Sequence, residues 1–77
     1  MKEAVERIIT ALVGEPDVVE VTEVEDGKNI RLEVRVAPHD MGRIIGREGR
    51  TVKAIRNILF AAGQKQNKRF HLDLIED

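Results

Sequence analysis

Residues 44–52 read Ile44-Ile45-Gly46-Arg47-Glu48-Gly49-Arg50-Thr51-Val52, in which one glycine precedes and one follows a pair of charged residues. A glycine has no Cβ, so the chain can bend sharply at both positions and another backbone can approach closely. The residues that follow, 50–56, begin a predicted helix, whose free N–H groups and dipole favour an anion at that end. The stretch therefore predicts a turn that binds a polyanion, and single-stranded RNA is the expected ligand.

The charge around this turn differs from the charge of the chain as a whole, which is −1. Residues 39–57 contain five basic and two acidic side chains, a balance of 5 − 2 = +3. Residues 1–29 contain three basic and eight acidic side chains, a balance of 3 − 8 = −5. Because salt screens exposed charges beyond about 8 Å, the local basic patch matters more than the total. A solvated helix face is the alternative interpretation of the same basic run.

Length and composition restrict the class of protein. A chain of 77 residues allows one domain, 1–77, and leaves no room for a separate catalytic lobe. The chain has no cysteine, which excludes a disulfide framework and a zinc-thiolate site. It has no apolar run of the ~20 residues that span a membrane, and residues 1–7 lack the apolar segment of a signal peptide. We expect a cytoplasmic protein without membrane contact, and self-association is expected because so small a core is marginally stable.

The residues before the turn predict a helix followed by a hairpin. Apolar residues recur at helical spacing near 2–13, which predicts an amphipathic helix that ends before Gly14 and Pro16. The valine-rich residues 17–25 predict a strand, and the Asp26-Gly27 pair is a strong signal for a hairpin turn. Residues 30–36 alternate between apolar and charged side chains, as expected for a strand with one buried face that ends before Pro38.

The residues after the hairpin predict two helices and a last strand. Asp40 is expected to cap a short helix that runs through Ile45. A longer helix is predicted over about 50–62, with Gly63 closing it. Its buried side is expected to consist of Val52, Ile55, Leu59 and Ala62. Residues 64–68 are expected to form a loop, and apolar alternation over 70–74 predicts the last strand.

The element order αββααβ determines the expected sheet. The last two strands are separated by two helices, so we expect them to be parallel neighbours joined by a right-handed crossover, with the hairpin strand antiparallel. The sequence therefore predicts an α+β fold in which three helices cover one face of a three-stranded mixed sheet.

The stretch Ile45-Gly46-Arg47-Glu48-Gly49-Arg50-Thr51-Val52 resembles the I-G-x-x-G-x-x-hydrophobic signature of KH domains. The order αββααβ is similar to that of the type II, or prokaryotic, KH fold, and the chain length resembles that of the small bacterial single-KH proteins of the KhpA family. The resemblance implies binding of single-stranded RNA and a role in RNA regulation, as a post-transcriptional regulator or RNA chaperone, linked to growth and cell shape. It also implies a homodimer, or a heterodimer with a second KH protein, KhpB (also called Jag).

Roles at the predicted site follow from residue chemistry and from this resemblance. Gly46 and Gly49 are expected to let the turn approach a sugar-phosphate backbone, the contact by which KH modules clamp about four nucleotides. The first candidates for phosphate neutralisation are Arg47, Arg50 and Lys53, and the second are Arg43 and Arg56. Glu48 departs from the pattern of many KH modules, which carry a basic residue in this tip. Its carboxylate is expected either to face solvent or to pair with Arg47 or Arg50.

Bases are expected in an apolar groove beside the turn. The candidates for this groove are Ile44, Ile45, Val36 and the Met41-Gly42 start of the short helix. Core packing explains each of these apolar residues as well, and it is favoured for Ile45 and Val36. The two aromatic residues, Phe60 and Phe70, are expected to pack in the core rather than to stack on bases, so the groove is expected to be aliphatic.

Other functions receive less support from the sequence. His39 and His71 are expected at the surface or in caps rather than in a metal site. The turn lacks the spacing of a P-loop, and the chain has neither serine nor cysteine, so we expect no enzymatic activity, no cofactor and no small-molecule substrate. A protein-interaction module with weak or no RNA binding remains the alternative, with the acidic residues 15–26 as a surface for a basic partner.

Overall fold

The computed structural model of the chain describes residues 1–76. Its helices and strands are, in order, α1 (Lys2–Leu12), β1 (Glu20–Asp26), β2 (Asn29–Arg35), α2 (Met41–Ile45), α3 (Arg50–Gln66) and β3 (Arg69–Ile75). Single 3₁₀ turns occur at Pro16–Val18, Pro38–Asp40 and Arg47–Gly49. The predicted order αββααβ and the α+β fold class are confirmed.

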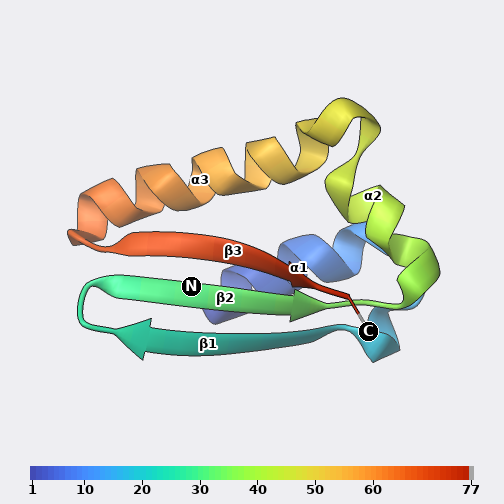
Figure 1. Cartoon of the computed structure of the whole chain (residues 1–77), viewed down its shortest axis with the longest axis horizontal. Helices are drawn as coiled ribbons and strands as arrows, with labels where there is room; N and C mark the ends of the chain where they lie inside the picture. The colour runs from blue at the N-terminus through green and yellow to red at the C-terminus, as the bar shows by residue number, and fades with distance from the viewer. Residues whose placement is uncertain (77) are drawn as a thin grey trace.

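The three strands form one mixed sheet in the order β1-β2-β3 (Figure 1). β1 and β2 are antiparallel, with Glu20 opposite Arg35 and Asp26 opposite Asn29. Gly27 lies in the tight turn between them at φ +61°, a conformation that glycine adopts without steric cost. β3 runs parallel to β2, with Asn29 opposite Arg69, so β3 is an edge strand of the sheet. The predicted strand order and strand directions are therefore confirmed.

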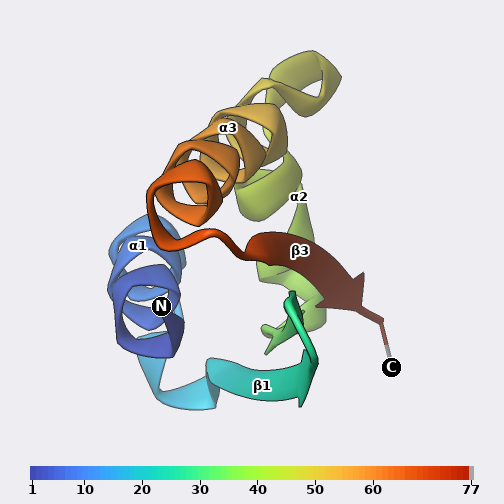
Figure 2. The ribbon, with the colours of Figure 1, turned by 90° about the vertical axis from the view of Figure 1, so that its left-hand side faces the viewer.

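The helices lie on one face of this sheet, as the view along the strands shows (Figure 2). The core forms between that face and the helices, because the alternation along each strand directs every second side chain toward it. Its buried members are Val5, Ile9, Val21, Leu32, Val34, Val36, Ile44, Val52, Ile55, Leu59 and Leu72. This core fixes α2 and α3, and hence the turn between them, against the sheet.

Two boundaries differ from the prediction. β1 begins at Glu20 rather than at residue 17, because Pro16 starts a 3₁₀ turn in which Asp17 and Val18 take part. α3 continues beyond Gly63 to Gln66 and ends at Asn67, which adopts the left-handed conformation at φ 55°.

Gly63 is required for close packing and not for ending the helix. A Cβ at this position would collide with the backbone oxygen of Lys68. The backbone N–H of Lys68 also donates a hydrogen bond of 2.9 Å to the oxygen of Gly63. The chain thus turns back tightly into β3, and residues 64–66, predicted as loop, form the last turn of α3.

Asp40 precedes α2 but its side chain does not cap it. The carboxylate is fully buried and accepts hydrogen bonds from the backbone N–H groups of Gly14, at 2.9 Å, and Glu15, at 3.1 Å. The prediction of a helix cap was therefore wrong, because the carboxylate instead accepts from two backbone N–H groups of the segment after α1. This contact joins the α1–β1 connection to the start of α2.

Candidate nucleic-acid interface

The turn between α2 and α3 has backbone angles that depend on its glycines. Gly46 and Gly49 lie at φ +75° and +74°, and Glu48 between them lies at φ 57°. A Cβ at Gly46 would lie 2.7 Å from the Cβ of Thr51 and 2.9 Å from its backbone nitrogen. A Cβ at Gly49 would meet nothing within 4 Å. Gly46 therefore closes the turn against α3, whereas Gly49 leaves its backbone open to an approaching ligand.

The N-terminus of α3 adjoins this open backbone. Gly49 is the residue before the helix and has no side chain with which to accept from the first helical N–H groups. The free N–H groups and the helix dipole favour an anion at this position. The turn thus combines an accessible backbone with N–H donors.

The three cations proposed to neutralise phosphate, Arg47, Arg50 and Lys53, are exposed and lie in the turn or in the first turn of α3. Arg50 approaches Glu48 at 3.5 Å, with both side chains about three-quarters exposed (76% and 74%). Such an exposed pair contributes roughly 0–1 kcal/mol, so a phosphate can readily displace it. Among residues 1–76, neither Arg47 nor Lys53 has an ion-pair partner. Glu48 therefore moderates only one of the three charges.

The second-rank cations are engaged elsewhere. The Nε of Arg43 lies 3.6 Å from Oδ1 of Asp40, so its charge is partly neutralised by a buried carboxylate. Nη2 of Arg56 donates a hydrogen bond of 3.2 Å to the backbone oxygen of Leu72 in β3. Arg56 thereby connects α3 to the edge strand rather than to the glycine turn.

One flank of α3 extends the basic patch away from the turn. Residues three and four apart lie above one another on a helix. This spacing aligns Arg50, Lys53, Asn57, Phe60 and Gln64, all of which are exposed. The buried stripe of the same helix consists of Val52, Ile55, Leu59 and Gly63.

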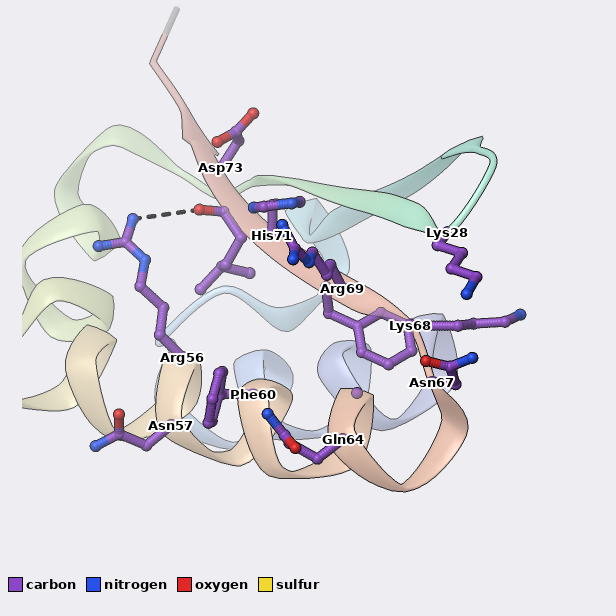
Figure 3. A pocket seen from close by; sticks show the side chains of 13 residues that line it. Lys28, Arg56, Asn57, Phe60, Gln64, Asn67, Lys68, Arg69, His71 and Asp73 are labelled. Carbon is purple, nitrogen blue, oxygen red and sulfur yellow. Dashed lines mark hydrogen bonds between the residues drawn. The ribbon is translucent and has the colours of Figure 1, made fainter.

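This flank borders a cleft of about 890 Å³ between α3 and β3 (Figure 3). α3 contributes Arg56, Asn57, Phe60 and Gln64 to its lining. β3 contributes residues 69–73, and Lys28 and Lys68 lie at one end. The sequence did not predict this cleft, because it joins a helix flank to a strand edge across the crossover.

Phe60 differs most from its prediction. It was expected to pack in the core, but its side chain is 67% exposed and lines the cleft. Phe60 follows the buried Leu59, and one residue along a helix turns the side chain by about 100°, away from the core. Phe70 is half-buried against the core, as predicted.

The predicted groove residues separate into two groups. Ile44 and Val36 are buried in the core, and Ile45 is half-buried and packs against it, so the preference for core packing at Ile45 and Val36 is confirmed and holds for Ile44 as well. Val36 and Met41 line a small hollow of about 250 Å³ together with Pro38, Ile75 and Glu76. A Cβ at Gly42 would meet nothing within 4 Å, so no helix packs closely there.

Asp40 carries the one titration shift that bears on this region. The hydrogen bond from the N–H of Gly14 lowers the pKa of the Asp40 carboxyl, and the N–H of Glu15 and the nearby His39 and Arg43 lower it further, against desolvation, which raises it. His39 is exposed and its Nε2 lies 3.1 Å from Oε2 of Glu15. The ligand atoms of Glu15, His39 and Asp40 lie within 4.8 Å of one another, a cluster that the sequence did not predict.

Comparisons with known proteins cover nearly the whole chain. A family model described as KhpA/KhpB, KH domain, matches residues 2–74. A protein of Halalkalibacterium halodurans named RNA-binding protein KhpA is 49% identical over 76 residues, which cover 99% of this chain and 100% of the relative. The proteins of the same name from Clostridium acetobutylicum and Aquifex aeolicus are 48% and 42% identical, over 97% and 99% of this chain and 100% and 96% of the relatives. Among residues 1–76, no helix has the length and apolar character needed to cross a membrane.

Proposed function

The chain belongs to the KhpA/KhpB family of KH domains, and on this basis we propose that residues 1–77 act as one type II KH domain that binds single-stranded RNA. The observation that carries the proposal is the junction of two features: an open glycine backbone at Gly49 and the exposed Arg47 and Lys53 beside it. Together they provide a surface on which a sugar-phosphate backbone can lie closely and be neutralised.

Phosphates bind at the turn and the start of α3. Gly49 admits the backbone of the strand, and the N–H groups at the helix N-terminus donate to phosphate oxygens. Arg47, Arg50 and Lys53 supply the charge, while Arg43 contributes less because Asp40 neutralises part of it. These contacts orient the strand but read no sequence.

Bases of the nucleotides held at the turn enter the cleft between α3 and β3 at its end nearest the turn, beside Arg56 and Leu72. The N–H of Arg69 donates to the oxygen of Lys28 at 2.8 Å, toward β2, whereas the oxygen of Leu72 accepts from Arg56 on the other side. The backbone N–H and C=O of successive residues point alternately to the two sides of a strand. The N–H and C=O groups of Phe70, Leu72 and Leu74 therefore face the free edge of β3. They offer donors and acceptors to base edges. Met41 and Ile45, which are half-buried at α2, provide apolar contact nearer the turn.

The cellular role proposed is that of a cytoplasmic post-transcriptional regulator or RNA chaperone, linked to growth and cell shape. Because phosphate contacts dominate this site and base contacts are few, we expect modest affinity and limited sequence selectivity. Binding alone accounts for the site, and the proposal includes no catalytic step, cofactor or small-molecule substrate.

A second proposal concerns self-association, as a homodimer or with a KhpB-like partner. Ile58 is 55% exposed on α3 and lies beside the exposed Ala54 and Ala61 at helical spacing. Such an apolar patch on a small domain gains stability when a second subunit covers it. The patch lies on the flank of α3 away from Phe60, so dimerisation and RNA binding are compatible.

The experiment that tests RNA binding replaces Arg47 and Glu48 by aspartate in one variant, which changes the charge by two units and keeps both glycines. We expect affinity for an unstructured oligoribonucleotide to fall by roughly tenfold or more, because the reversed charge repels the phosphates. A tenfold loss corresponds to about 1.4 kcal/mol of binding free energy. Fluorescence anisotropy at several salt concentrations measures this loss. In the wild type, the slope of log K against log[salt] is expected to be about −0.7 for each phosphate contact.

The matched control is Arg7→Asp, which makes the same charge change on the exposed surface of α1. Circular dichroism is expected to give folded spectra for both variants. Equal affinities for the wild type and the Arg47→Asp/Glu48→Asp variant would reject the turn as the phosphate site. An equal loss of affinity in the Arg7→Asp control would show that the loss reflects net charge and not the turn.

A further inference from the structure

Phe60 is a large apolar side chain that the fold leaves in the open. Burying a phenylalanine contributes roughly 1.5–3 kcal/mol, and this residue forgoes most of that at 67% exposure. It points into the cleft between α3 and β3, as Figure 3 shows. We infer that Phe60 is a stacking platform for a nucleobase of the RNA strand, beyond the nucleotides held at the glycine turn. The inference rests on the RNA binding proposed above.

The side chains around Phe60 match the edges of a base. Asn57 and Gln64 lie three residues before and four after it on the same flank of α3, and both line the cleft. An amide side chain offers both a donor and an acceptor, so the two can bind the polar edge of a ring that stacks between them. An aromatic ring flanked by amides binds unpaired bases of any sequence, because every base has a π-face.

The charge of the cleft matches the backbone of the same strand. Four cations line it, Lys28, Arg56, Lys68 and Arg69, against Asp73, a balance of 4 − 1 = +3. Asp73 lies 3.6 Å from Arg31, and Lys68 lies 4.0 Å from Glu25, so each charge is partly compensated by a neighbour outside the cleft. An aromatic side chain in a cationic groove is the combination by which proteins bind single-stranded nucleic acid.

Phe60 lies on the same flank of α3 as the cations near the turn, but at a distance from the turn itself. Phe60 follows Arg50 by ten residues, about 15 Å along the helix axis, and the exposed Lys53 and Asn57 lie between them on the same flank. A strand that follows α3 from the turn therefore passes charged and polar side chains before it reaches the ring.

A protein partner fits this site less well than a base does. Ile58, the exposed apolar residue of the proposed subunit contact, is two residues from Phe60 and about 200° away around the helix. The two side chains therefore do not form one apolar patch. Phe60 stands among amides and cations, whereas the core of a protein interface is depleted of charged residues.

The test compares Phe60→Ala with the wild type on oligouridylates and oligoadenylates of increasing length, from about four nucleotides, the number held at a KH turn, to about twice that number. Wild-type affinity is expected to rise with length. Phe60→Ala is expected to bind the shortest oligomers as the wild type does, and to lose about tenfold on the longest, since one stacked base is worth a factor of this order. Phe60→Tyr is expected to restore the dependence on length.

The variant Phe60→Trp gives a direct fluorescence signal, because the chain has no tryptophan of its own. Its fluorescence is expected to change on binding long oligomers and to stay constant with the shortest. An equal loss for all lengths in Phe60→Ala, or a change in oligomeric state by light scattering with unchanged RNA affinity, would overturn the inference. Absence of RNA binding by the wild type would instead overturn the proposed function, and this inference with it.

Discussion

The two exposed flanks of α3 differ in chemistry although they share one helix and one buried stripe. One flank carries Arg50, Lys53, Asn57, Phe60 and Gln64, which are charged, amide or aromatic. The other carries Ala54, Ile58, Ala61 and Lys65, of which three are apolar. The first flank begins at the glycine turn and borders the cleft, whereas the second borders neither.

This difference allows a domain with one small core to present both of the proposed ligand surfaces. The buried residues Val52, Ile55 and Leu59 fix the rotation of α3 about its axis, so each flank always faces the same direction. A polyanion on one flank and a protein on the other then do not compete for the same atoms.

The largest effect is expected from Asp40→Asn, which acts on both flanks through the scaffold. The amide nitrogen cannot accept a hydrogen bond, so the partly buried N–H of either Gly14 or Glu15 loses its partner, and the new amide is left facing it in the interior. We expect a lower melting temperature at pH 7, with RNA affinity of the folded fraction retained. Thermal unfolding followed by circular dichroism measures the change, with the exposed Asp26→Asn as the control.

The same variant is expected to alter the pH dependence of stability. The pKa of Asp40 is lowered in the folded protein, so its contribution is fully present above the unfolded value, about 3.9, and is lost as pH falls through the folded value. The wild-type melting temperature should therefore fall more steeply below about pH 4 than that of Asp40→Asn. Parallel curves for the two proteins would show that this carboxylate does not govern acid stability.

An intermediate effect is expected from Ile58→Asp, which separates the flanks. A charge in the centre of an apolar contact typically weakens association by about 2 kcal/mol or more, roughly 30-fold. Light scattering is expected to show a shift toward monomer, while affinity for a short oligoribonucleotide stays unchanged. Val18→Asp, at another exposed apolar residue, is the control. A joint loss of association and RNA binding would mean that the flanks are coupled.

The smallest effect is expected from a pair of charge reversals, one on each flank, whose effects on RNA binding are compared. Lys53→Glu changes the polar flank, and Lys65→Glu makes the same change on the other. Loss of one phosphate contact should lower the salt slope by about 0.7 in Lys53→Glu and leave it unchanged in Lys65→Glu. Equal salt slopes in the two variants would indicate attraction by net charge without a defined track along α3.

Local patterns predicted most of the fold. The Asp26-Gly27 turn, the alternation over 30–36 and the helical spacing around Val52 each specify an element from neighbouring residues alone, and all three are confirmed. The glycine turn was also predictable, because positive φ at Gly46 and Gly49 needs that residue type.

The features that the sequence did not predict depend on distant residues. Asp40 has the composition of a helix cap, but its acceptors serve N–H groups 25 and 26 residues earlier in the chain. Gly63 resembles a helix end, but it is needed where the backbone of Lys68 passes closely. Phe60 was assigned to the core because it is apolar, although its helical phase relative to Leu59 already placed it outside. The position of Phe60 around the helix, relative to the buried Leu59, was the signal from which its exposure could have been predicted.

The parallel pairing of β2 with β3 has a consequence for the order in which the molecule assembles. β1 and β2 are joined by a tight turn and can pair within microseconds, as hairpins do. Asn29 and Arg69, which are opposite each other in the sheet, are separated by forty residues of chain. Closing so long a segment carries a larger entropic cost and delays the pairing. A nascent chain that has emerged only as far as α3 therefore contains the residues of the glycine turn but lacks β3, which forms one side of the cleft.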